Sequence, residues 1–253
     1  MSSEEIFDPE KSVKSDPDPD PSVRSEGLPN SYDIVAAAAD PSLTEDLALK
    51  MLKQTELRSE VFERLRKNAA IANSRKVKIA LLCHAKTPRH VALPLLPHLF
   101  TFDLMQIALQ PVVPPDIKVA AENALIQRLD QLSTGEKLSL ARRASGRVAA
   151  RLLTDPEMRV VAIALENARL TEASILKTIS MQEASRFLID AISRHPKWSL
   201  RQEIRWGLLR NEYTSEDRAL EFATDLPSER LREMMQHSGL PEHIKSRLLQ
   251  QEQ

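Results

Sequence analysis

The sequence predicts an all-α protein built as a right-handed α-solenoid of stacked helical repeats. Ala and Leu are abundant, aromatic residues make up only 4% of the 253 residues, and this composition favours helices over strands. From residue 31 onward, apolar residues recur at i, i+3, i+4 and i+7, which is the period of a helix with one buried face. Glycine occurs 5 times and proline 16 times, so proline is the expected punctuation between helices.

The chain divides into a disordered acidic tail, residues 1–30, and a helical-repeat domain, residues 31–253. The tail holds eight acidic and three basic residues, a net charge of −5 in a chain of net charge −1, so the domain carries +4. Its run Asp16–Pro21 alternates Asp with Pro, which blocks a helix and offers no apolar face. Two roles remain open for it: a solubilising extension, or a tether or competitor that acts on a basic surface. As a competitor, it would displace an anionic partner from the basic stretch around Arg75, Lys76, Lys78 and Arg89.

A repeated helix start divides the domain into about five units of roughly 42 residues. Four segments share an Ala/Leu-rich stretch, a short polar break, a threonine and then a helix of mixed charged and apolar residues. The threonines are Thr44, Thr87, Thr171 and Thr214, at spacings of 43, 84 and 43 residues, and a weaker start near Ser133 falls in the long interval. Because a threonine hydroxyl accepts from a free backbone N–H of the first helical turn, we expect each to be an N-cap.

One unit carries a family resemblance. Residues 152–179, LLTDPEMRVVAIALENARLTEASILKTI, resemble HEAT repeats in the start Asp155-Pro156 followed by Arg159-Val160-Val161. They also resemble the leucine-rich repeat variant family, whose units pair a DPxxxV-type helix with a TxxxLxxL-type helix. The resemblance implies an α-solenoid of HEAT/armadillo-like repeats and no particular activity.

The resemblance has departures, and an irregular helical bundle stays open as the alternative. Cys83 and His84 fall where the variant family tends to have Asn-Pro, and the third unit is degenerate. For the clearest units we predict burial of the apolar helix positions Val160, Ile163, Leu176, Ile179, Leu188 and Ile192.

No catalytic, cofactor-binding or metal-binding set is expected. The patterns GxSxG, HExxH, CxxC and the phosphate loop are absent. Cys83, His84, His90 and His98 lie within 16 residues, but Cys83 and His84 are adjacent and point about 100° apart on a helix. We therefore predict structural roles for these four residues.

The expected compartment is the cytoplasm. Cys83 is the only cysteine, so no disulfide forms within the chain. The first residues contain no apolar stretch typical of a secretory signal, and no run approaches the 18 or so apolar residues of a membrane helix. No membrane association is expected.

Two basic stretches without acids are the candidate binding surface. Residues 64–102 contain eight bases and residues 137–154 contain five, with no Asp or Glu in either stretch. The candidate anion- or partner-binding residues are Arg75, Lys76, Lys78, Arg89, Arg142, Arg143, Arg147 and Arg151. Because a solenoid places equivalent helices side by side, we expect these bases on one surface that attracts phosphate or carboxylate. The alternative is that acids from neighbouring repeats balance them.

Two tryptophans offer a second candidate feature. Trp198 and Trp206 are eight residues apart, a spacing that puts them on roughly one helix face. They either anchor the core of the fourth repeat or form a ligand-facing platform. HEAT-like DNA glycosylases are similar in size and use aromatic and acidic residues against a nucleotide, a resemblance of architecture only.

These observations favour a non-enzymatic scaffold that binds a protein partner along an extended concave surface, because stacked repeats create such surfaces. The alternative is a nucleic-acid-binding HEAT-like protein, possibly a DNA base-excision enzyme. The absence of aromatic residues among the bases does not favour stacking on single strands.

Overall fold

The structure, a computed structural model, describes residues 31–224 and 226–250, so the predicted acidic tail lies outside the described residues. In this part of the chain all regular secondary structure is helical, which confirms the all-α prediction. The helices are α1 (Ser31–Ala39), α2 (Glu45–Met51), α3 (Ser59–Lys67), α4 (Arg75–Cys83), α5 (Arg89–Ala92), η1 (Leu93–His98), α6 (Thr101–Leu109), α7 (Pro115–Arg128), η2 (Leu129–Gln131), α8 (Thr134–Arg143), α9 (Gly146–Leu152), α10 (Met158–Leu165), α11 (Glu172–Ile179), α12 (Arg186–Arg194), α13 (Gln202–Leu209), α14 (Glu216–Ala223), α15 (Ser228–Gln236) and α16 (Glu242–Gln250).

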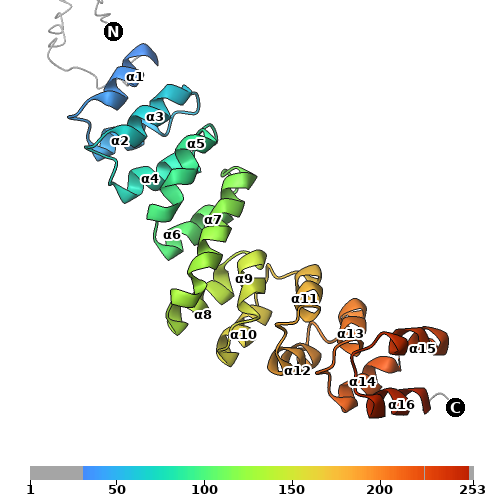
Figure 1. Ribbon diagram of the computed structural model, residues 1–253. Helices are drawn as coiled ribbons and strands as arrows, with labels where there is room; N and C mark the ends of the chain where they lie inside the picture. The colour runs from blue at the N-terminus through green and yellow to red at the C-terminus, as the bar shows by residue number, and fades with distance from the viewer. Residues whose placement is uncertain (1–30, 225, 251–253) are drawn as a thin grey trace, which may run out of the picture.

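The helices stack in chain order into an elongated body, with α1 at one end and α16 at the other (Figure 1). Helices two apart in the order pack side by side, as α2 does with α4, α8 with α10, α9 with α11, and α11 with α13. Contacts such as those of α6 with α7 and of α13 with α14 join the two resulting layers. Packing therefore links helices that are close in sequence, as it does in repeat proteins.

A continuous apolar core runs between the two layers, and the predicted core residues test the helical phase. Val160, Leu188 and Ile192 are fully buried and Ile179 is 3% exposed, as expected. Ile163 and Leu176 are only partly buried, so their predicted burial is wrong. In α11 the buried residues are Ile175, Thr178 and Ile179. Successive helical residues point about 100° apart, so a phase error of one residue moves a side chain from the core to its edge.

Some of the predicted N-cap residues do cap helices in the structure. The hydroxyls of Thr44 and Thr171 accept from the backbone N–H three residues later, at 3.4 and 3.3 Å, so both N-cap predictions are confirmed. Ser133 caps α8, and the carboxylate of Glu136 accepts a hydrogen bond from the backbone N–H of Ser133, which completes a capping box. The weaker start near Ser133 is thus a well-capped helix.

The other two threonine caps were predicted wrongly. Thr87 donates to the carbonyl oxygen of Leu81 at 2.5 Å, and Thr214 donates to that of Leu208 at 2.6 Å. Both threonines are buried and satisfy the last carbonyls of the preceding helix, not the first N–H groups of the next one. The same sequence pattern therefore has two structural outcomes. In two units the threonine hydroxyl caps the start of the next helix, and in the other two it contacts the end of the preceding helix.

Buried asparagines tie successive helix pairs together. Asn167 is 1% exposed, and its Nδ2 donates to the carbonyl oxygens of Ala141 and Ala144 at 2.7 and 3.2 Å. Asn68 uses the same atom to reach the carbonyl oxygen of Ala38 at 3.0 Å. Asn211 likewise donates to a carbonyl 32 residues earlier, at 3.0 Å. Each Oδ1 accepts from the N–H two residues later, so both ends of the amide are used.

His84 makes a similar bridge at the end of α4. Its Nδ1 accepts from the backbone N–H of Lys86 at 3.1 Å, which makes Nε2 the protonated nitrogen. Nε2 then donates to the carbonyl oxygen of Gln54 at 2.8 Å. The imidazole therefore contacts a carbonyl 30 residues earlier and an N–H two residues later, as the three asparagine amides do with comparable partners.

Candidate functional site

Four of the grooves in the described part of the chain open between neighbouring helices of the same layer. They are the α2–α4 groove of about 820 Å³, the α8–α10 groove of about 560 Å³, the α11–α13 groove of about 670 Å³ and the α9–α11 groove of about 510 Å³. Because helix stacking creates them, they recur along the length of the molecule.

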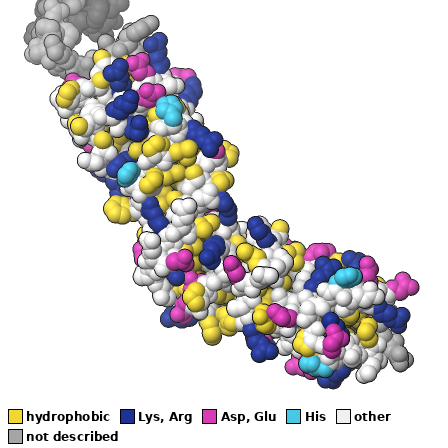
Figure 2. Space-filling view, in the orientation of Figure 1, with side chains coloured by type: hydrophobic (Ala, Val, Ile, Leu, Met, Phe, Trp, Pro, Cys, Tyr) yellow, Lys and Arg dark blue, Asp and Glu magenta, His cyan; other side chains and the backbone are white. Residues whose placement is uncertain are grey.

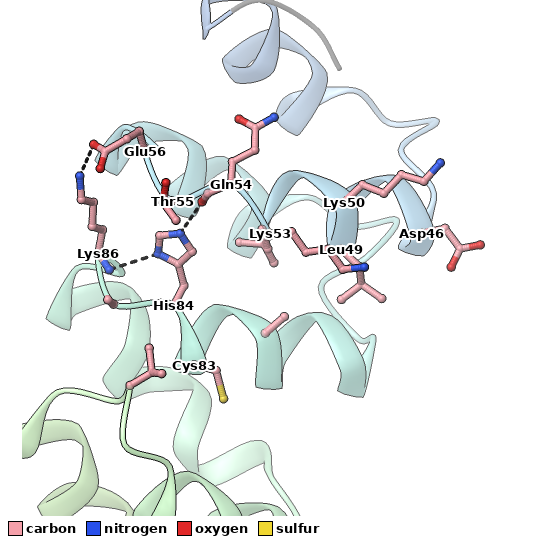
Figure 3. A pocket seen from close by; sticks show the side chains of 14 residues that line it. Asp46, Leu49, Lys50, Lys53, Gln54, Thr55, Glu56, Cys83, His84 and Lys86 are labelled. Atoms are coloured by element: carbon pink, nitrogen blue, oxygen red, sulfur yellow. Dashed lines mark hydrogen bonds and ion pairs between the residues drawn. The ribbon is translucent and has the colours of Figure 1, made fainter. Parts of the chain in front are cut away.

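The α2–α4 groove has an apolar floor and a charged rim. Leu49 and Leu52 from α2 meet Ala80 and Cys83 from α4 on its lining. Figure 3 shows Lys50 and Lys53 on one side, and Glu56 joined to Lys86 on the other. His84 sits beside this pair and holds the turn that ends at Gln54 (Figure 3). The mixture of apolar surface with charges of both signs suits a protein side chain better than a phosphate backbone.

The cysteine and histidines of this region turn toward different partners. Burial raises the pKa of the Cys83 thiol, so it stays protonated at neutral pH and is a poor nucleophile. His84 contacts a backbone carbonyl, whereas His90 lies 3.0 Å from the carboxylate of Glu63. Among the residues that the structure describes, no three His, Cys, Asp or Glu side chains are grouped as metal ligands would be.

Two of the predicted binding residues on α4 are neutralised by adjacent helices. Arg75 donates from Nε and Nη2 to the carboxylate of Asp103 on α6, at 2.8 and 2.6 Å, and this hydrogen bonding raises the pKa of Arg75. Asp103 is 1% exposed. Lys76 donates to Glu45 on α2 at 2.7 Å, and this hydrogen bond lowers the pKa of Glu45. Both cations therefore bind acids of the protein itself.

The remaining bases of the first stretch do not form a common surface with them. Arg89 lies on α5, in the other layer, 3.6 Å from the carboxylate of Asp116. Lys78 is half-buried on α4 and has no ion-pair partner among the described residues. The acids that balance this stretch lie in the helices before and after it.

The second basic stretch is divided between the two layers. Arg147 and Arg151 lie on α9 and line the α9–α11 groove. Arg147 donates to Asn123 at 2.7 Å and pairs with Glu122 at 3.4 Å, while Arg151 donates to the hydroxyl of Thr154. Their cationic groups are therefore engaged within the protein.

Arg142 and Arg143 have a different setting. They lie at the end of α8 and line the α8–α10 groove together with Arg159 of α10. Arg159 was not predicted as a site residue, because it lies outside the acid-free stretch. Its place in the near-consensus start Asp155-Pro156-Glu157-Met158-Arg159 was the available signal.

The two tryptophans do not share a face. Trp198 precedes α13, is 3% exposed, and donates from Nε1 to the carbonyl oxygen of Leu165 at 2.9 Å. Trp206 lies within α13, lines the α11–α13 groove and stacks under the guanidinium of Arg230, 4.0 Å from the ring centroid. The prediction that Trp198 anchors the core is confirmed. The prediction that both tryptophan rings form one ligand-facing platform is wrong.

One face of the molecule carries mixed charges. Figure 2 shows Lys and Arg side chains interspersed with Asp and Glu along the stack. Exposed hydrophobic side chains occur within residues 100–119, namely Phe100, Phe102, Val112 and Val119. Val112 also lines the α2–α4 groove, so apolar surface continues out of it.

No family model matches this chain, and no curated protein or solved structure is significantly similar to it. Within the described residues, no helix has the length and apolar character that a membrane span requires.

Proposed function

We propose that the chain is a right-handed α-solenoid of about five HEAT-like repeats, a cytoplasmic, non-enzymatic scaffold that binds a protein partner along the grooves between its helices. The packing of near neighbours in two layers supports the solenoid, and so do the recurring bridges made by Asn68, Asn167 and Asn211. A resemblance to HEAT and leucine-rich repeat variant proteins stays a proposal that rests on the repeat pattern.

The ion pairs of the basic residues support a protein partner over a nucleic acid. Lys76 pairs with Glu45, Arg89 with Asp116, and Arg147 with Glu122, each across neighbouring helices. A protein that binds nucleic acid must neutralise several phosphates with free Lys and Arg. The paired cations leave an electrostatically mixed surface with apolar grooves, which is the composition of a protein–protein interface.

A nucleic-acid-binding protein, possibly a DNA base-excision enzyme, is the second candidate. The observation that favours it is the group of Arg142, Arg143 and Arg159, which have no acid beside them on the lining of their groove. Three cations are fewer than the 6–10 or so phosphate contacts of a strong DNA-binding surface.

Site-specific photo-crosslinking in the source cells tests the scaffold. A photoreactive amino acid replaces Lys53 in the α2–α4 groove or Gln182 in the α11–α13 groove, with exposed Lys67 on α3 as the control position. We expect discrete protein adducts from the two groove positions and none above background from Lys67. Equal adducts at all three positions, or none at any, would contradict the proposal.

Fluorescence anisotropy with duplex DNA separates the two candidates. The scaffold predicts weak binding at about 50 mM salt and little further change at about 200 mM. Tight binding that weakens steeply between these salt concentrations would favour the nucleic-acid candidate.

A further inference from the structure

The α8–α10 groove combines three arginines without acidic partners. Arg142, Arg143 and Arg159 line it, and all three are exposed. None of them makes an ion pair with a residue in the described part of the chain, and no Asp or Glu side chain lines the groove. Their charge is available to a ligand, unlike that of the paired bases elsewhere in the stack.

The neighbouring cations show that this arrangement is local. Lys137, which immediately precedes the groove-lining Leu138 on α8, pairs with Asp155 at 2.9 Å, and both side chains are largely buried. Arg147, just beyond the groove on α9, is held by Glu122 and Asn123. The pairs of Lys137 and Arg147 limit the patch along α8 and α9, whereas Arg169, which donates to the carbonyl oxygen of Arg143 at 3.3 Å, adds a further cation beside it.

The groove floor is apolar. Leu138 from α8 faces Ala162 and Ile163 from α10, and Ile163 is one of the residues that the sequence predicted to be buried. Its partial exposure here leaves hydrocarbon surface between the arginines. A ligand that matches both features carries carboxylates on either side of an apolar side chain.

We propose that the α8–α10 groove binds an acidic, extended segment of the protein partner, whose carboxylates contact Arg142, Arg143 and Arg159 and whose apolar side chain rests on Leu138 and Ile163. This inference rests on the proposed scaffold function and names the chemistry of its partner. A planar guanidinium binds a carboxylate through two parallel hydrogen bonds, so three arginines specify spacing as well as charge. On the lining of this groove, a nucleic acid would meet three cations and no aromatic ring on which a base could stack.

A peptide titration tests the groove in the full-length chain. The probe is a short fluorescein-labelled peptide that repeats Glu-Glu-Leu, compared with versions in which Gln replaces every Glu or Ser replaces every Leu. We expect binding of the first peptide to exceed that of either control by at least about fivefold at about 50 mM salt. Equal affinity for the peptide with Gln in place of Glu would show that the groove does not recognise carboxylates, and would overturn the proposal.

Two triple variants locate the binding. R142A/R143A/R159A removes the patch, while K67A/R186A/R201A removes the same charge from exposed positions elsewhere. The first should bind the Glu-Glu-Leu peptide at least about tenfold more weakly than the wild-type chain, and the second within about twofold of it. Thermal unfolding of both variants checks folding, and the single substitution R159Q, with a partial loss of binding, is the fallback if the triple variant unfolds.

Further outcomes separate this inference from the scaffold proposal. Equal peptide affinity for the two triple variants overturns the groove assignment, whereas crosslinks from Lys53 and Gln182 would still support the scaffold. An oligonucleotide that binds more tightly than the peptide and loses affinity in R142A/R143A/R159A overturns the acidic-peptide assignment in favour of nucleic acid. Loss of peptide binding in the first variant alone supports the proposal.

Discussion

Asn167 donates from Nδ2 to the carbonyl oxygen of Ala141 at 2.7 Å and so ties the turn after α10 to the end of α8. Its Oδ1 accepts from the backbone N–H of Arg169 at 2.8 Å, and the residue is 1% exposed. The one amide group therefore makes hydrogen bonds both to a backbone carbonyl of α8 and to a backbone N–H in the turn after α10. The same contact fixes the spacing of α8 and α10, on which the arginine groove depends.

Asn167→Ala should lower the free energy of unfolding by about 2–3 kcal/mol, because it leaves buried carbonyl and N–H groups without partners. Asn73→Ala, which removes an exposed amide, should change it by less than about 0.5 kcal/mol. Urea unfolding followed by circular dichroism measures both. Similar small losses in the two variants would show that the bridge at Asn167 contributes little.

Adjacent positions on α11 provide a matched test of the helical phase. Ile175 is fully buried, whereas Leu176 is partly buried and lines the α11–α13 groove. Ile175→Ala should cost about 2–5 kcal/mol of unfolding free energy, and Leu176→Ala about half as much or less. Denaturant melts of the two variants check the order. A larger loss for Leu176 would place the helix in the phase first expected from the sequence.

The ion pairs of Arg75 and Lys76 should differ in strength. Arg75 makes two hydrogen bonds to the buried carboxylate of Asp103, whereas Lys76 makes one to the more exposed Glu45. A double-mutant cycle through Arg75→Ala and Asp103→Ala should give the larger coupling free energy, because water screens that pair less. The coupling between Lys76 and Glu45 should fall further as salt is added. The reverse order in these cycles would refute the argument.

Alkylation of Cys83 should report its environment in the α2–α4 groove. Burial raises the thiol pKa above its ordinary value of 9.0, so the thiolate forms only at higher pH. The rate of reaction with iodoacetamide should therefore rise with an inflection above that of N-acetylcysteine measured in parallel. Cys83 is the only cysteine, so no other thiol contributes to the signal. An inflection at or below that of the reference thiol would rule out the raised pKa.

Deleting residues 1–30 tests whether the acidic segment competes with acidic ligands. The segment lies outside the described residues, and its net charge of −5 is the basis of the prediction. If it competes for the arginines of the α8–α10 groove, the truncated chain should bind the Glu-Glu-Leu peptide about two- to fivefold more tightly at low salt. The gain should fade at higher salt. Unchanged affinity at low salt would leave the segment a solubilising extension.

The sequence determined the helical character of the chain and several of its helix starts. Apolar periodicity is a local property, and so is a hydroxyl that caps the N–H three residues later, as at Thr44 and Thr171. Thr87 and Thr214 show the limit of such reasoning. Their hydroxyls turn back to the preceding helix, a choice that depends on how the two helices pack.

The tertiary structure decided which charges are free. Arg75 and Lys76 meet carboxylates that lie 28 and 31 residues away, so an acid-free stretch of sequence is neutralised in space. Arg142 and Arg143 instead gain Arg159 from the next helix of their layer. Coulomb energy depends on the distance between groups in the fold and not on their separation along the chain. Only the stacking of the helices could therefore show where the available positive charge lies.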